Sequence, residues 1–170
     1  PNGGPMNIFY LHPDPVVAAQ MQCDKHVVKM ILETAQLLST AHRVLDHKDN
    51  PDKFYKATHR NHPSAKWVRE SAANYAWAYD HFVALCDEYT YRYGKVHATD
   101  RKMRGLLSAP PRNIQHGFWF REPPQCMPDE YKQADTVEAY RAYYQSPDKQ
   151  HFAAWTKTRP APGWYKFEEF

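Results

Sequence analysis

The stretch HPSAKWVRESAANYAWAYDHFVALCDEYTYRYG, residues 62–94, decides the fold class. It opens with His62-Pro63, and proline is favoured in the first turn of a helix, where its missing amide hydrogen is not needed. Gly94 is typical of the left-handed residue that ends a helix. The residues between them predict one long helix to Tyr93, because a mainly apolar stripe recurs three or four positions apart: Trp67, Ser71, Tyr75, Ala78, Phe82, Leu85 and Tyr89.

A second long helical pattern precedes this stretch. Asp14-Pro15 supplies a capping carboxylate followed by a proline at the first helical position. The pattern runs to about Leu45, with a candidate break at Cys23-Asp24, where Asp24 caps the second segment. Its core face follows from apolar residues at helical spacing: Val27, Val28, Ile31, Leu32, Ala35 and Leu38.

The remaining patterns predict short elements. A brief extended entry is expected over 6–11, and short helices over 100–107, from the Asp135 cap to about 145, and over 147–157. Strand signals are scarce, so we expect an all-α fold: a compact bundle of two long helices and several short ones, with an ordered aromatic C-terminal arm over 159–170. We interpret residues 1–5 as an expression scar and residues 6–170 as a single helical domain.

Composition restricts the function classes. The 170 residues contain no apolar run long enough for a membrane span, and their mean hydropathy is -0.81. Three widely spaced cysteines form neither a disulfide framework nor a paired-cysteine zinc site. A net charge of +3 permits a nucleic-acid partner. The start shows no secretory or transit pattern, so we expect a cytoplasmic monomer that does not act at a membrane.

The chemistry is concentrated in CDKHVVKMILETAQ, residues 23–36. Steps of three and four place one polar stripe on this helix: His26, Lys29, Glu33, Gln36 and Thr40. If the stripe is enclosed, burial raises the pKa of Glu33 and a neighbouring lysine or histidine opposes the rise. Such groups suit general acid–base catalysis. The alternative is a solvated face with an ordinary Lys29–Glu33 ion pair.

Two further clusters have a functional and a structural interpretation each. His59-Arg60-Asn61-His62 can contact phosphates or bases beside a helix start, or simply cap that helix. Cations alternate with aromatic residues in the tail from Arg159 to Phe167, which can stack bases and hold phosphates, or seal the core. No metal-ligand spacing and no phosphate-binding glycine loop is present, so we expect no metal and no cofactor.

The order and spacing of these motifs resemble a known family. Asp24 is followed by His26 two residues on and by Glu33 seven residues beyond the histidine. A long helix ends at Gly94, and the tail contains Arg159-Pro160 followed by Trp-Tyr-Lys-Phe. This arrangement is similar to that of the phage-type pyrimidine-dimer DNA glycosylases, also called endonuclease V.

The resemblance implies a phage-encoded DNA glycosylase with abasic-site lyase activity on double-stranded DNA. It implies that Glu33 stabilises the cationic intermediate and moves protons, and that an amine of Met6 or Lys29 attacks the sugar. His26 would help to orient the catalytic site. The expected DNA contacts are Lys25, Arg60, His62, Trp164 and Lys166.

This sequence departs from the family pattern at three places. Asn7 follows Met6 where the family has its N-terminal threonine, and Leu32 and Gln36 replace arginines that flank the glutamate. Because of these departures the sequence supports the fold better than it supports dimer excision, and the expected activity is excision of a damaged or modified pyrimidine. Two alternatives remain open: a phage-type DNA base-modifying transferase on the same scaffold, and a non-catalytic DNA-binding domain.

Overall fold

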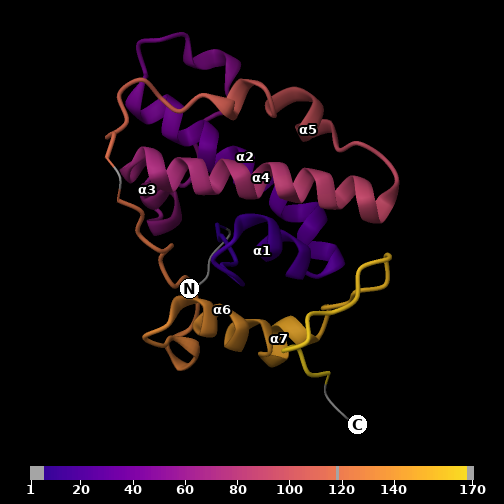
Figure 1. The fold of residues 1–170 in the computed structure, drawn as a ribbon. Coiled ribbons are helices and arrows are strands. Elements are labelled where there is room, and N and C mark those ends of the chain that lie inside the picture. The colour runs from indigo at the N-terminus through magenta and orange to yellow at the C-terminus, as the bar shows by residue number, and fades with distance from the viewer. Residues whose placement is uncertain (1–5, 118, 168–170) are drawn as a thin grey trace.

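The computed structural model describes residues 6–117 and 119–167, and the interpretation of residues 1–5 as an expression scar lies outside them. Every regular element in this part of the chain is helical, which confirms the expected all-α fold with two long helices (Figure 1). The α-helices are α1 (Pro15–Met21), α2 (Asp24–Leu45), α3 (Pro63–Glu70), α4 (Ala72–Tyr93), α5 (Ala98–Met103), α6 (Thr136–Tyr144) and α7 (Pro147–Gln150), with short 3-10 turns η1 (Pro51–Lys53), η2 (Leu106–Ser108) and η3 (Asp129–Tyr131).

Helix α4 is the centre of the bundle. It packs against α1, α2 and α3, and in Figure 1 it crosses the middle of the molecule with α2 behind it and α1 below. The buried apolar side chains form one cluster that includes Trp67, Phe82 and Leu38. The expected extended entry, residues 6–11, is buried within this cluster. None of the helices in residues 6–117 and 119–167 is long and apolar enough to cross a membrane.

The prediction of a single helix from His62 to Tyr93 is wrong, because the helix is interrupted at Ser71. Ser71 has extended backbone angles, φ -154° and ψ 158°, and its hydroxyl accepts a hydrogen bond from the Asn74 amide at 3.1 Å. The Ala72 amide donates to the Gln115 carbonyl instead of to a helical partner. Serine competes well for helix-starting amides, so a serine within an apolar stripe starts a new helix here.

Two other predicted boundaries need correction. The break between α1 and α2 is confirmed, but Cys23 occupies the capping position and Asp24 is already helical. The helix expected over 147–157 ends at Gln150. Beyond Gln150 the chain lies across the start of α2, because the Asp24 amide donates a hydrogen bond to the Ala154 carbonyl at 2.9 Å. The Asp135 cap is confirmed by its hydrogen bond from the Glu138 amide.

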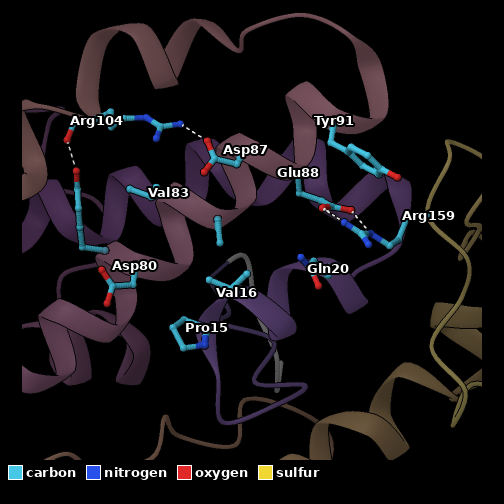
Figure 2. Close-up of a pocket in the computed structure, with 12 residues that line it drawn as sticks. Pro15, Val16, Gln20, Asp80, Val83, Asp87, Glu88, Tyr91, Arg104 and Arg159 are labelled. Carbon is cyan, nitrogen blue, oxygen red and sulfur yellow. Dashed lines mark hydrogen bonds and ion pairs between the residues drawn. The ribbon is translucent and has the colours of Figure 1, made fainter.

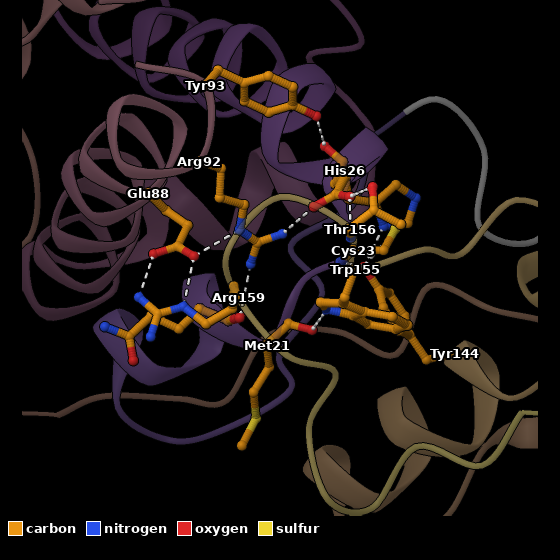
Figure 3. Close-up of polar contacts among 12 residues, drawn as sticks. Met21, Cys23, His26, Glu88, Arg92, Tyr93, Tyr144, Trp155, Thr156 and Arg159 are labelled. Atoms are coloured by element: carbon orange, nitrogen blue, oxygen red, sulfur yellow. Dashed lines mark hydrogen bonds and ion pairs between the residues drawn. The ribbon is translucent and has the colours of Figure 1, made fainter. Parts of the chain in front are cut away.

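A buried ionic network attaches the C-terminal arm to the bundle (Figure 3). Arg92 lies 3.1 Å from Asp24 and 2.7 Å from Glu88, and none of the three side chains is more than 11% exposed. Arg159 donates to both Glu88 oxygens at 2.9 Å. The Thr156 amide and hydroxyl donate to the other oxygen of Asp24. These bonds hold residues 156–159 against the bundle and fix the start of α2 against the end of α4, while residues 168–170 of the expected arm lie outside the described residues.

Candidate active site

Glu33 lies in a cavity between α2 and the entry segment. The cavity measures about 290 Å³, and Glu33 is only 8% exposed. Lys29 reaches Glu33 along the helix, with its Nζ 3.9 Å from Oε2, and the Lys29 side chain is 68% exposed. The cavity therefore has an enclosed acid and a solvated amine. Its lining residues are Met6, Lys29, Leu32, Glu33, Gln36, Thr58 and His59.

Asn7 shapes the entry segment beside this cavity. Its side-chain oxygen accepts hydrogen bonds from the Ile8 and Phe9 amides at 2.7 and 3.1 Å, and its Nδ2 donates to the Cys126 carbonyl. Phe9 consequently turns through a left-handed conformation with φ 52°, which is uncommon for a bulky residue. The turn holds Met6 in the cavity wall and directs the Asn7 amide at Glu33.

Burial controls the protonation of Glu33. It raises the pKa of the carboxyl from 4.5 to about 7, against the opposing effects of Lys29, the Asn7 amide and Lys149. Near neutral pH the group therefore exists in both forms, and it can either give or take a proton. The interpretation of this stripe as a solvated face fails at Glu33, although the Lys29–Glu33 pair itself is present.

His26 lies in the interior rather than in the Glu33 cavity. Its ring stacks on Phe9 at 4.3 Å between centroids, and its Nδ1 lies 2.5 Å from the Tyr144 hydroxyl. Burial lowers the pKa of His26 to about 3, with further lowering from Lys149 and Lys29. The imidazole is therefore neutral at ordinary pH and supports the turn at Phe9, and it does not present a positive charge to a phosphate.

The histidine cluster before α3 supplies the Glu33 cavity with a residue other than Arg60 and His62, which the sequence indicated. His62 caps α3, since its Nδ1 accepts a hydrogen bond from the Ser64 amide at 3.1 Å. Arg60 is exposed and does not line the Glu33 cavity. His59 does line it, with its Nδ1 2.8 Å from the Thr58 hydroxyl and a left-handed φ of 47°. The cluster was visible in the sequence, but only the fold selects His59.

The expected DNA contacts of the tail differ in accessibility. Trp164 packs on Arg141, whose guanidinium lies 5.2 Å from the ring centroid, and on Tyr144, so it helps to dock the arm. Lys166 is exposed, and its backbone exchanges two hydrogen bonds with the Gln145 side chain. Lys25 is also exposed and lines a second cavity that shares Lys29 with the first.

A larger cavity lies elsewhere, between α1 and α4, and measures about 580 Å³ (Figure 2). Two of its carboxylates are engaged by arginines: Asp87 lies 2.7 Å from Arg104, and Glu88 bonds Arg159. It is lined by no lysine, in contrast to the smaller Glu33 cavity. Within residues 6–117 and 119–167, no group of three histidine, cysteine or acidic side chains is placed to hold a metal ion.

A comparison with protein families gives one match. The model of the pyrimidine dimer DNA glycosylase family covers residues 6–102, more than half of the chain. The matched range includes Met6, Lys29, Glu33 and His59, which line the cavity described above. Searches of curated proteins and of solved structures found no match. This chain belongs to the pyrimidine dimer DNA glycosylase family.

Proposed function

We propose that this chain is a DNA glycosylase with abasic-site lyase activity that releases a damaged or modified pyrimidine from double-stranded DNA. The family supports DNA as the substrate. One observation supports the chemistry above all: the enclosed Glu33 carboxyl and the Lys29 amine line the same cavity, 3.9 Å apart. An amine nucleophile beside a carboxylate is what an imine-forming glycosylase requires.

The reaction uses the amine to replace the base. The ammonium group first gives a proton to Glu33. The amine nitrogen then bonds to the anomeric carbon, the bond to the base breaks, and the base leaves with the electron pair and takes up a proton. The nitrogen then loses a proton and the sugar ring opens, which gives a protonated imine as the ring oxygen accepts a proton. Removal of a proton from the adjacent carbon expels the 3′ phosphate. Glu33 stabilises the cationic stages and transfers these protons.

Two amines are candidates for the nucleophile. In the 170-residue sequence the Met6 nitrogen is joined to Pro5 in a peptide bond, so it is a free amine only in a chain that begins at Met6. Lys29 carries its amine in either case. We assign His26 the neutral role of holding Phe9 and thereby the entry segment.

A base must be extruded from the stack to expose the anomeric carbon of the sugar to Glu33, at a cost of a few kcal/mol. The exposed cations Lys25, Arg60 and Lys166 are suited to contact the backbone during this step. His62 and Trp164 would then act on DNA mainly by fixing the start of α3, next to Arg60, and the arm that carries Lys166.

Borohydride trapping tests this function. A duplex with one abasic site is incubated with the chain and reduced, and the crosslinked peptide is mapped by mass spectrometry. We expect an adduct on Lys29, or on the Met6 α-amine in protein that begins at Met6. Lys29→Arg removes the first adduct only, and Lys25→Arg serves as the matched control because it changes a neighbouring lysine outside the Glu33 cavity.

The same experiment separates the alternatives. A base-modifying transferase leaves the glycosidic bond intact and forms no imine. A silent DNA-binding domain binds in a salt-dependent way and yields neither an adduct nor a free base. Absence of an adduct and of released base across damaged and modified duplexes would overturn the glycosylase assignment.

A further inference from the structure

Leu32 and Gln36 lie side by side on α2 in the wall of the Glu33 cavity. Both residues line the cavity, and residues four apart on a helix are neighbours on its surface. The helical spacing assigned Leu32 to the core together with Val28, but this prediction is wrong for both, because they are 43% and 36% exposed. The fold therefore leaves an apolar side chain at the cavity, where a ligand can contact it.

The Gln36 side chain has hydrogen-bonding capacity that the fold does not use. The residue is partly buried, and within residues 6–117 and 119–167 its amide has no hydrogen-bond partner. A side-chain amide presents a donor and an acceptor next to each other. The pyrimidine edge that carries N3 and the C4 substituent presents the complementary pair. One glutamine can therefore make two hydrogen bonds to this edge, as glutamine does with base edges in DNA grooves.

His59 faces these two residues from the segment before α3, and its backbone segment is attached to α2. The Thr58 amide donates a hydrogen bond to the Thr40 hydroxyl at 3.2 Å, and the Thr58 hydroxyl lies 2.8 Å from His59 Nδ1. An imidazole can stack on the flat face of a base. The cavity thus combines an apolar side chain, an unpaired amide and an aromatic ring, which are the contacts that recognise a base outside the stack.

We propose that the Glu33 cavity takes up one pyrimidine base, with Leu32 against its C5 substituent and Gln36 on the edge formed by N3 and the C4 substituent. C5 and C4 are neighbours on the ring, as Leu32 and Gln36 are on the helix. This inference rests on the proposed function, because the base is bonded directly to the anomeric carbon at which Glu33 acts. It adds a substrate class, since pyrimidines with an apolar group at C5 are preferred.

Duplex affinities of the full chain test this site. Three duplexes differ at one position opposite guanine, which holds thymine, uracil or a tetrahydrofuran residue without a base. The first two nucleotides carry a 2′-fluorine to block glycosidic cleavage, and a mispaired base costs less to extrude. The thymine and uracil duplexes have the same backbone, so the ratio of their affinities reports the C5 methyl group. We expect wild-type protein to prefer thymine about fourfold, the value of one buried methyl group.

Two variants separate the two contacts. Leu32→Ala should lower the preference for thymine to about one. Val28→Ala is the matched control and should keep the preference, because Val28 is exposed one turn earlier on α2 and does not line the cavity. Gln36→Leu should weaken binding of the thymine and uracil duplexes about tenfold, for two lost hydrogen bonds, and leave the tetrahydrofuran duplex unchanged.

The outcomes separate this site from the proposed function. Equal affinity of wild-type protein for thymine and uracil, or a preference that survives Leu32→Ala, overturns the base site even if base release is intact. A preference that depends on Leu32 supports the base site even if no duplex yields an imine adduct or a free base, and the glycosylase assignment then fails alone. If Gln36→Leu changes no affinity, or weakens the tetrahydrofuran duplex equally, Gln36 does not read the base edge and the proposed arrangement is wrong.

Discussion

Replacing Glu33 by glutamine should stabilise the folded chain, and increasingly so as the pH rises. The pKa of this carboxyl is 4.5 in its reference state and about 7 in the fold, because burial disfavours the charged form. A group with a raised pKa contributes stability that is fully present below the lower value and is lost as the pH rises through the higher one. Wild-type protein therefore loses this contribution between weakly acidic and neutral pH.

The size of the effect follows from the two pKa values. At about 1.4 kcal/mol per pH unit, the full loss is roughly 3 kcal/mol, of which about 2.5 kcal/mol falls between about pH 5 and about pH 8.5. Glu33→Gln has no proton to lose at this site. The difference in unfolding free energy between the variant and wild type should therefore grow by about 2.5 kcal/mol in favour of the variant over that range.

Urea unfolding at a series of pH values measures this difference. Buried histidines titrate in both proteins, so their contributions cancel in the comparison. Glu130→Gln, which changes an exposed glutamate, should give a difference that does not vary with pH. A difference between Glu33→Gln and wild type that is equally flat would mean that Glu33 ionises as a solvated group does, and the enclosed acid would be refuted.

Three further predictions concern the scaffold. Ser71→Ala removes the cap of α4 and should lower stability by about 1 kcal/mol, measured by thermal unfolding; no change would show that the break has another cause. Arg92→Leu removes the buried cation between Asp24 and Glu88, which keep only Thr156 and Arg159 as partners. It should cost about 3–5 kcal/mol, read from urea midpoints, whereas a neutral result would contradict the network in Figure 3. Burial lowers the pKa of His81 from 6.5 to about 4, so the contribution of this residue to stability is present above pH 6.5 and is lost as the pH falls. Between neutral pH and about pH 4.5, the free energy of unfolding of His81→Gln should therefore fall by roughly 2–3 kcal/mol less than that of wild type. Equal acid sensitivity in both proteins would contradict this.

Local sequence signals were enough for several helix starts and for the proximity of Lys29 and Glu33. Asp14 and Asp135 cap their helices as their positions predict. Lys29 and Glu33 are four residues apart on one helix, so their proximity needs no tertiary information. Such features could be predicted because the residues that make them are close along the chain.

The parts that were missed depend on contacts between distant segments. Lys149 reaches the site only because the chain after α6 folds back beside α2, and no local pattern marks it. His59 enters the Glu33 cavity through a left-handed turn, while its neighbour His62 caps α3. The sequence indicated Asp24 as a helix cap. Its carboxylate instead forms an ion pair with Arg92 and accepts a hydrogen bond from Thr156, both of which are distant in the sequence.

Base release by Glu33→Gln tests the central claim most directly. Wild-type protein and the variant are incubated with duplexes that carry damaged or modified pyrimidines, and free bases are quantified by mass spectrometry alongside duplex affinity. Glutamine keeps the shape of the side chain but can neither carry the negative charge nor exchange the proton. We predict loss of base release with duplex affinity unchanged. Base release at the wild-type rate would contradict the assignment of Glu33 as the catalytic acid–base.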